Sequence, residues 1–384
     1  MGAVARRDRL LRVVSIASAS GRYGGPFDTA CRQALVLSES LQVTIAAGYF
    51  AGDIASVAPQ VRAAFFRVRA LAWFAEFSGA FSVTALRTLW SETKRADFVH
   101  VSIAREAVPI AAATMARFHG RTLVIQPHGM LTSRTSFAHR TFDVPLRALL
   151  GRRPRVIALT EREADELRRW FGPRAQPRIT VLGNPLPALP TRSTSKDSKD
   201  VLFLARLHPR KRVEDFVEAA TYASASGLAG DYVVVGPDEG DLHLVEAASY
   251  RVQNLSYEGV LSADEVTVRL SRARVFVLPS LNEPWGNVLV AALALGIPVV
   301  VTESAALAAS IGEFDAGVVV PDRSPLAIAS AVDRLLNNEG EYAEKVAGAL
   351  NLAADKFGSD QQKSALLHVL GVGPAGNEER NESL

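Results

Sequence analysis

The stretch VLFLARLHPRKR, residues 201–212, and the stretch PSLNEPWGNVLVAALALGIPVVV, residues 279–301, decide the fold of this chain. Each adjoins a short apolar run of the kind that forms a buried strand of a parallel sheet. The first run, Val201–Leu204, is followed by two cations, Arg206 and Lys211. Because ligands of open α/β sheets bind outside the carboxyl ends of the strands, we expect these cations to border a binding crevice.

The second stretch supplies the other side of the expected crevice. It follows a buried strand predicted at Val275–Leu278, and its loop contains Glu283 before a helix that begins near Gly286. Two cations beside a helix N-terminus opened by glycine make an anion site of diphosphate size. Glu283 is a hydrogen-bond acceptor suited to hydroxyl groups. A diphosphate together with hydroxyl groups predicts a nucleotide sugar as the ligand.

These motifs resemble those of the retaining glycosyltransferases of family 4, the glycosyl transferases group 1, over roughly residues 12–370. The resemblance implies the GT-B fold, in which two Rossmann-like doubly wound domains face each other across a cleft. In that family an R-x4-K pattern holds the donor diphosphate, which implies this role for Arg206 and Lys211. The glutamate of an E-P-[FW]-G segment contacts the donor sugar, which implies this role for Glu283.

The resemblance also implies contacts from backbone groups. The amides around Gly286, Asn287 and Val288 would meet the phosphates, and Val260 would meet the nucleobase. The family usually has a second glutamate eight positions after the first, where it binds the ribose, but this chain has Ala291. Losing a charged acceptor for ribose hydroxyls costs about 1–3 kcal/mol of donor binding. We therefore expect donor affinity or donor identity to differ from the family norm.

Two motifs of the N-terminal half complete the expected site. The segment GRYGGP, residues 21–26, follows the first predicted strand and matches neither the dinucleotide fingerprint nor a Walker motif. The resemblance places its Gly24 and Gly25 near the donor phosphates and the acceptor; an ordinary tight turn is the alternative. His128 ends a buried strand, and the resemblance places it near the donor sugar. We expect it to position the sugar and stabilise charge, not to act as a general base; a structural histidine is the alternative.

The remaining polar motifs favour structural roles or metal-free chemistry. Thr160 and Glu163 predict a helix capping box, and Asp238 and Glu239 are typical of a surface turn. No D-x-D motif occurs, and the histidines lack the spacing of metal ligands. The sequence thus predicts a metal-independent transferase in which fixed positive charge stabilises the leaving diphosphate of an oxocarbenium-like transition state. The resemblance implies retention of anomeric configuration.

Composition places the chain among soluble two-domain proteins. It has 384 residues, of which 48% are hydrophobic and 22% charged, so each of two domains can bury its own core. A single cysteine, Cys31, excludes an intramolecular disulfide and suits a reducing compartment. The apolar run Val288–Val301 is too short to span a bilayer, and Leu11–Ala17 is more typical of a first strand than of a signal peptide. We therefore expect a cytoplasmic protein.

Charge is distributed unevenly along the chain. Residues 1–190 contain 26 Lys and Arg against 13 Asp and Glu, whereas residues 191–384 contain 17 against 27. A basic half predicts contact with an anionic surface. The segment 61–77 interleaves arginines with aromatic residues, so we expect either a membrane-interface helix or a plain core helix there. Nucleic-acid binding is disfavoured because no nucleic-acid module accompanies the charge.

Alternating strand-like and helix-like segments predict two doubly wound α/β domains. We expect an acceptor domain over residues 1–190, a polar linker over 191–200 and a donor domain over 201–358. The resemblance implies that residues 359–371 form a helix that returns to the first domain, and 372–384 have the composition of a disordered tail. Strands are expected at Leu11–Ala17, Val43–Ala47, Phe98–Ile103, Leu123–Gln126, Val156–Leu159 and Ile179–Leu182, and near Val201, Tyr232, Leu255, Val275 and Val299.

The resulting hypothesis is a glycosyltransferase of the hexosyltransferase type. It would move a sugar from a nucleotide-diphosphate sugar to a saccharide or lipid-linked acceptor, in the synthesis of a polysaccharide, a glycolipid or a cell-wall glycan. Two alternatives stay open. A nucleotide-sugar epimerase of GT-B type would keep the same phosphate contacts but would need crevice carboxylates and histidines. A degenerate transferase that serves as a non-catalytic partner is the other, and Ala291 makes it conceivable.

Overall fold

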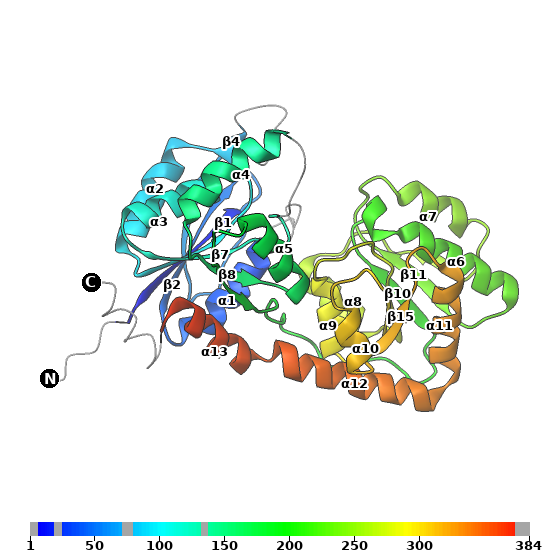
Figure 1. Cartoon of the computed structure of the whole chain (residues 1–384). Coiled ribbons are helices and arrows are strands. Elements are labelled where there is room, and N and C mark those ends of the chain that lie inside the picture. Colours follow the sequence, from blue (N-terminus) through cyan, green and yellow to red (C-terminus); the bar gives the residue numbers. More distant parts are fainter. Residues whose placement is uncertain (1–6, 19–24, 71–79, 132–136, 373–384) are drawn as a thin grey trace. The chain divides into compact units, whose positions relative to one another are not determined.

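The chain forms two compact α/β units in a computed structural model (Figure 1). The first unit takes the described parts of Met1–Pro185 and Ser359–Leu384, and the second takes Leu186–Gly358. Because each unit has its own sheet and its own apolar core, each is described by itself below. The structure describes residues 7–18, 25–70, 80–131 and 137–372.

The first unit is built on a seven-stranded sheet in which every pair of neighbouring strands is parallel. The strand order is β3-β2-β1-β6-β7-β8-β9. A separate antiparallel pair, β4 (Arg69–Ala70) and β5 (Ala80–Phe81), lies outside this sheet. The strands of the large sheet are β1 (Arg9–Ile16), β2 (Gln42–Tyr49), β3 (Arg62–Arg67), β6 (Phe98–Ser102), β7 (Thr122–Gln126), β8 (Arg155–Ala158) and β9 (Arg178–Val181).

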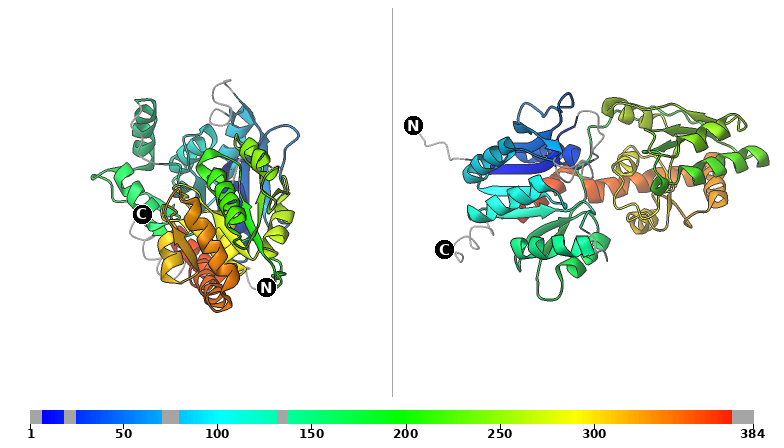
Figure 2. Two further views of the ribbon diagram at one scale, coloured as in Figure 1. Left: turned by 90° about the vertical axis from the view of Figure 1, so that its right-hand side faces the viewer. Right: turned by 90° about the horizontal axis from the view of Figure 1, so that it is seen from above.

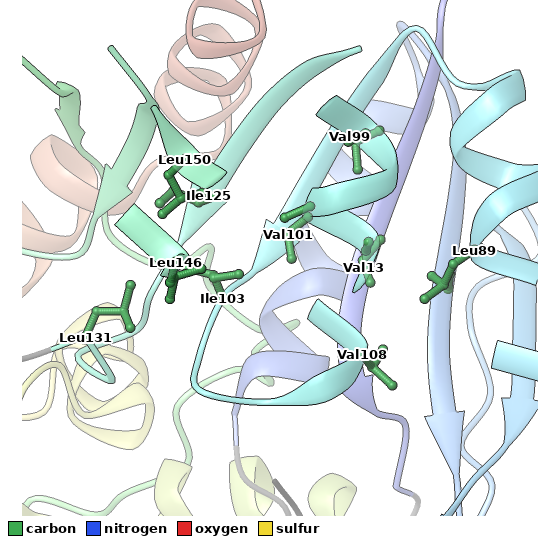
Figure 3. Close-up of a cluster of buried hydrophobic side chains, with 14 of the residues drawn as sticks. Val13, Leu89, Val99, Val101, Ile103, Val108, Ile125, Leu131, Leu146 and Leu150 are labelled. Atoms are coloured by element: carbon green, nitrogen blue, oxygen red, sulfur yellow. The ribbon is translucent and has the colours of Figure 1, made fainter. Parts of the chain in front are cut away.

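Helices cover both faces of this sheet because successive strand residues point to opposite sides. Along β1, Leu11 and Val13 enter one apolar cluster, whereas Leu10 and Val14 enter another. Figure 3 shows the first cluster, where Val13 and its strand neighbours lie beside side chains of the covering helices. The helices of this unit are α1 (Pro26–Ser38), α2 (Val83–Arg95), α3 (Ala107–Phe118), α4 (Phe137–Leu150), α5 (Glu161–Phe171) and α13 (Ser359–Leu370).

The second unit repeats this architecture with six parallel strands in the order β12-β11-β10-β13-β14-β15. Two further views show it as the green-to-orange part of the ribbon (Figure 2). Its strands are β10 (Asp200–Leu204), β11 (Asp231–Val235), β12 (Leu255–Tyr257), β13 (Val275–Leu278), β14 (Val299–Thr302) and β15 (Gly317–Val320). Its helices are η1 (Pro209–Lys211), α6 (Val213–Ser226), α7 (Leu242–Ser249), α8 (Ala263–Ser271), α9 (Asn287–Ala294), α10 (Ala308–Glu313), α11 (Pro325–Asn337) and α12 (Glu339–Phe357).

Both sheets contain a point at which the strand order reverses. In the first unit the reversal falls between β1 and β6, and in the second it falls between β10 and β13. In open α/β sheets the loops on either side of such a reversal leave toward opposite faces, and ligands bind at this carboxyl edge. The fold thus places one candidate ligand position on each unit.

The last helix packs against the first unit although it directly follows a helix of the second. Only Gly358 separates α12 from α13. Leu366, Val369 and Leu370 of α13 join the apolar cluster that also contains α1, and Arg155 donates a hydrogen bond of 2.9 Å to the Val369 carbonyl. The chain therefore closes the core of its first unit with its C-terminal helix.

Most expected strands are present, and the fold class is confirmed as two parallel-sheet α/β units. The helix expected over residues 61–77 is wrong: Arg62–Arg67 form strand β3, which pairs with β2 in register from Thr44. Trp73 and Phe74 of that segment lie outside the described residues. Pairing with a neighbouring strand satisfies the backbone of 62–67 at an edge of the sheet, a tertiary contact that local periodicity does not reveal.

The polar segment expected as a linker is partly bound to the second unit. The guanidinium of Arg192 donates to the Gly296 carbonyl at 2.7 Å, and the Ser193 amide donates to the Ser271 carbonyl at 3.0 Å. Within the described residues, no helix is long and apolar enough to cross a membrane.

Candidate functional site

The loop after β10 carries Arg206 and is fixed by backbone hydrogen bonds to the loop after β11. The Leu207 amide donates to the Pro237 carbonyl at 2.8 Å, and the Leu207 carbonyl accepts from the amides of Glu239 and Asp241, each at 3.2 Å. These bonds also bring Arg206 beside Glu239, whose carboxylate oxygens lie 2.8 and 3.1 Å from one guanidinium nitrogen. Both side chains are partly exposed, so a phosphate could replace Glu239 as the partner of Arg206.

Asp238 has the structural role expected of a turn residue, whereas Glu239 does more. The Asp238 carboxylate accepts from the amides of Gly240 and Leu242 at 2.8 and 3.2 Å, and these bonds lower its pKa. Glu239 forms the ion pair with Arg206. No local pattern indicates that pair, because the two residues are 33 positions apart and meet through the parallel pairing of β10 with β11.

Lys211 and Glu283 form an ion pair across the reversal point of the second sheet. Their side chains are 13% and 5% exposed, so the pair lies below the surface. The Leu281 amide donates to the Arg210 carbonyl at 2.9 Å, and the Ala306 amide donates to the Glu283 carbonyl at the same distance. The loops after β10 and β13 are therefore bound to each other, which holds a cation and a carboxylate at the carboxyl edge of the sheet.

Helix α9 begins at this edge from a left-handed glycine. Gly286 has φ +76°, a conformation that side chains disfavour, and an added Cβ would lie 3.1 Å from the Cβ of Leu289. The following residues, Asn287 and Val288, form the first turn of α9, and no side-chain hydrogen bond caps this helix. An uncapped N-terminus of a helix attracts anions. The helix thus lies beside Lys211 with its positive end at the same loop.

The two other donor-side residues lie at opposite extremes of exposure. Val260 is exposed and follows Gly259, whose carbonyl accepts from the Gly236 amide at 2.9 Å. Ala291 is buried in the second turn of α9. The methyl group of Ala291 is therefore packed against its neighbours.

In the first unit, the partly exposed His128 joins a buried polar network on the α1-facing side of the sheet. Its Nε2 lies 3.0 Å from the Ser102 hydroxyl at the carboxyl end of β6, and that hydroxyl accepts from Arg12 of β1 at 2.9 Å. Arg12 also donates to Gln33 of α1 at 3.2 Å, and Gln33 donates to Gln126 at 3.0 Å. The sequence did not single out Arg12 or Ser102, because an arginine within an apolar run is ordinarily an edge or surface residue.

The turn that carries His128 is held by Glu163. The Glu163 carboxylate accepts from the amides of Gly129 and Leu159, each at 2.6 Å. Thr160 accepts from the Glu163 amide at 3.2 Å and is the expected N-cap of α5, but the reciprocal half of the capping box is wrong. The carboxylate bonds to the two strand ends instead, since two amides with no strand partner offer more than the single amide of Thr160.

A second carboxyl group at the same edge was missed entirely. Glu106 precedes α3, is buried, and hydrogen-bonds to the Ser15 hydroxyl near the end of β1. Ser15 and Glu106 thus occupy the reversal point between β1 and β6. Burial raises the pKa of Glu106 to about 8, so the group is mostly a neutral acid at pH 7. An acid followed by an apolar helix resembles an ordinary helix start, and nothing in the local sequence indicates its burial.

The glycine-rich loop is described only at its end. Gly25 precedes α1, and its carbonyl accepts from the Thr29 amide at 2.9 Å, while Gly24 lies outside the described residues. Within the described residues, no group of three His, Cys, Asp or Glu side chains could hold a metal ion.

Two models of known protein families match this chain. The model of the family described as glycosyl transferases group 1 matches residues 190–349, and that of the glycosyl transferase 4-like domain matches residues 3–185. The chain belongs to the group 1 glycosyltransferases. The two matches follow the two units of the structure. The Arg206–Lys211 and Glu283–Gly286 motifs both fall within the group 1 match, in the second unit.

Characterised relatives of this glycosyltransferase are distant. A D-inositol 3-phosphate glycosyltransferase of Streptomyces bingchenggensis is 27% identical over 58% of this chain and 53% of its own. An alpha-D-kanosaminyltransferase of Streptomyces kanamyceticus is 27% identical over 63% of this chain and 68% of its own. The chain thus spans only about half of the first relative's length.

Solved structures confirm the GT-B fold. Anabaena Alr3699/HepE in complex with UDP has a TM-score of 0.72 at 14% identity, over 94% of this chain and 99% of its own. WaaG, described as a glycosyltransferase involved in lipopolysaccharide biosynthesis, has a TM-score of 0.67 at 15% identity, over 94% and 99%. At these identities the likeness concerns the fold.

The first prediction concerns Glu106. Glu106→Gln should stabilise the protein at pH 8 and leave its stability unchanged near pH 4. The folded state keeps a proton up to about pH 8, whereas the unfolded chain loses it near the ordinary value of 4.5. Stability linked to this group is therefore fully present below pH 4.5 and falls as the pH rises toward 8, and glutamine removes that fall. Urea unfolding at pH 4, 6 and 8 measures it, and a pH-independent difference would contradict the assignment.

The second prediction concerns the backbone beside Arg206. Gly236→Ala should destabilise the second unit by at least about 2 kcal/mol more than Gly240→Ala, because overpacking adds to backbone strain. Both glycines have positive φ, but a Cβ at Gly236 would lie 1.9 Å from the Ala205 carbonyl oxygen, whereas a Cβ at Gly240 meets nothing within 4 Å. Thermal and urea unfolding compare the two variants, and equal losses would show that the contact with Ala205 relaxes freely.

Proposed function

We propose that this chain transfers a hexose from a nucleotide-diphosphate sugar to a hydroxyl group of a saccharide or lipid-linked acceptor, with retention of configuration. The observation that carries the proposal is the Lys211–Glu283 pair at the reversal point between β10 and β13, with Arg206 in the same segment after β10. Polysaccharide, glycolipid or cell-wall glycan synthesis is the setting in which such an acceptor occurs. The solved relative that holds UDP supports a nucleotide as part of the donor.

The proposed donor position uses fixed charge in place of a metal ion. Arg206 would exchange Glu239 for the diphosphate, and Lys211 would contact a phosphate oxygen while it stays near Glu283. The N-terminus of α9 at Gly286 adds the positive end of a helix dipole. As the bond between sugar and phosphate breaks, negative charge grows on the leaving diphosphate, and these groups stabilise it.

Sugar recognition would fall to two side chains. The Glu283 carboxylate has one oxygen bonded to Lys211 and can accept from sugar hydroxyls with the other. His128 would contact the sugar from the first unit. Val260 and Gly25 complete the proposed donor contacts, at the nucleobase and at the phosphates.

The third prediction tests the donor position. Arg206→Ala and Lys211→Met should each weaken binding of a nucleoside diphosphate about 10- to 100-fold, since a charge-assisted hydrogen bond contributes about 1.5–3 kcal/mol. Arg210→Ala is the matched control, because Arg210 is an exposed arginine of the same short helix η1. Glu239→Ala should keep or raise the affinity, because it removes the competing partner of Arg206. Isothermal titration with UDP, GDP and ADP measures the binding.

A Glu283 variant distinguishes binding of the sugar from binding of the nucleotide in the same titrations. Glu283→Gln should lose affinity for the nucleotide sugar while it keeps affinity for the bare nucleoside diphosphate. An equal loss for both ligands would mean that the carboxylate only holds Lys211 in place. Nucleotide-sugar binding without transfer or hydrolysis would favour a non-catalytic partner, and an epimerised sugar product would favour an epimerase.

We also propose that the first unit binds an anionic membrane from the cytoplasmic side, through a surface on α2 and α3. Trp90 and Phe118 are 44% and 73% exposed, and their ring centroids lie 5.2 Å apart. Val83 extends the apolar surface along α2. The sole acidic residue of α2, Glu92, is buried, and exposed basic side chains remain around the aromatic pair. Exposed aromatics surrounded by cations suit the headgroup region of an anionic bilayer.

The fourth prediction tests this surface. The double variant Trp90→Ser, Phe118→Ser should reduce sedimentation with phosphatidylglycerol vesicles at least about tenfold, because it removes most of the exposed aromatic area. Tyr250→Ser is the control, since Tyr250 is a fully exposed aromatic residue of the second unit. Wild-type protein should bind phosphatidylcholine vesicles weakly. Unchanged binding of the double variant to anionic vesicles would reject the surface.

A further inference from the structure

Arg12 is a buried cation without a counterion. The residue lies in the middle of β1 with 1% of its surface exposed, and no carboxylate pairs with it in the described part of the chain. Its guanidinium donates instead to neutral acceptors, namely Gln33, Ser102 and the carbonyls of Val13 and His100, at 2.9 to 3.3 Å. A buried unpaired charge is expensive, which favours a role beyond packing. Burial lowers the pKa of Arg12 to about 9, which still leaves it charged at pH 7.

The hydrogen bonds of Ser102 determine where protons lie. A guanidinium can only donate, so the Ser102 oxygen must accept the bond from Arg12. Among the described residues, the only other polar partner of this hydroxyl is Nε2 of His128 at 3.0 Å. The hydroxyl oxygen has a second lone pair that could accept from a protonated Nε2, but the hydroxyl proton would then have no partner among the described residues. The arrangement that pairs every group has the hydroxyl donate to an unprotonated Nε2. The remaining ring nitrogen, Nδ1, then carries the proton of the neutral imidazole.

The backbone supports the same orientation of the ring. His128 has φ +53°, a left-handed conformation that non-glycine residues rarely adopt. The next amide, that of Gly129, is held by the Glu163 carboxylate at 2.6 Å. Ser102 holds the ring of His128 and Glu163 holds the amide that follows it, so the strained backbone is fixed from both sides. Such strain is typical of a residue whose side chain must point in one direction.

We propose that Arg12 and Ser102 are positioning residues that fix His128 as the neutral tautomer protonated at Nδ1, so that it offers an N–H donor to a substrate hydroxyl and cannot act as a general base. The part of this proposal that concerns a substrate hydroxyl rests on the proposed function, whereas the assignment of the tautomer does not. A general base needs a free lone pair on the ring, and the one lone pair of this tautomer is occupied by Ser102.

Burial and the charge of Arg12 keep His128 neutral between pH 5 and 8. Burial first, and the charge of Arg12 second, lower the pKa of His128 to about 3. His100 of β6 also faces Arg12, and burial is the main cause that lowers its pKa well below the ordinary value. Glu163 of α5 is the nearby carboxyl group; burial raises its pKa, while its two backbone bonds lower it. The imidazole thus remains a donor between pH 5 and 8.

The experiment is a two-bond 1H–15N correlation spectrum of histidine-labelled full-length protein between pH 5 and 8, with His128→Gln for assignment. Wild-type His128 should show a protonated Nδ1, an unprotonated Nε2 and no titration. Ser102→Ala should shift the ring toward the Nε2-protonated form, and Ser102→Thr should restore the wild-type pattern. Ser15→Ala is the control, because Ser15 also lies near a strand end but its hydroxyl bonds to Glu106.

Arg12→Met tests the electrostatic part, since methionine keeps the length of the side chain and removes its charge. The pKa of His128 should rise in this variant, which the same spectra measure when the titration is extended to pH 3. A wild-type ring protonated at Nε2, or one that titrates above pH 5, would overturn the proposal. If Arg12→Met does not fold, the Ser102 variants decide alone, because the tautomer shift is then the whole test.

Activity separates this inference from the proposed function. With a donor and acceptor that support transfer, Ser102→Ala should lower kcat about tenfold with an unchanged KM for the donor, and Ser102→Thr should recover it. A purely structural serine would leave kcat and the tautomer unchanged. The predicted tautomer without any sugar transfer would reject the proposed function and leave the tautomer assignment standing.

Discussion

The reversal of strand order in each parallel sheet is the constraint on which the rest of this structure depends. In a doubly wound sheet the loops on either side of the reversal diverge, so backbone groups there lose their strand partners and side chains gain room. The second unit fills this position with Lys211 and Glu283, and the first fills it with Ser15 and Glu106. Each unit thus uses the same edge of the same architecture to gather polar groups that the apolar strands behind it exclude.

The two units differ in the partners of their cationic side chains. In the second unit the cations are paired with carboxylates, and the partner of Arg206, Glu239, is partly exposed, so an incoming anion can replace it at little cost. In the first unit Arg12 is buried among neutral acceptors, and the neighbouring histidines have lowered pKa values. One arrangement suits a ligand that carries charge, and the other suits a ligand whose hydroxyl groups need neutral donors and acceptors.

The predictability of these features from sequence follows their physical origin. The strand at Val275–Leu278 and the helix after Gly286 were predicted because apolar runs and positive-φ glycines are local signals. The strand at Arg62–Arg67 was mistaken for a helix because its stability comes from pairing with β2. Arg12 and Glu106 were not recognised as functional candidates, since burial of a charged residue is set by helices distant in sequence. Local patterns thus indicate candidate binding residues, while tertiary packing decides which charged residues are buried.

The two glutamates at the reversal points differ in the groups that they contact. Glu283 forms an ion pair with Lys211. Glu106 has only a serine hydroxyl as its described polar partner, and burial therefore favours the neutral acid. A carboxylate accepts hydrogen bonds, whereas a neutral carboxylic acid also donates one. The same residue type at equivalent places in the two sheets thus has different partners, a lysine ammonium group in one unit and a serine hydroxyl in the other.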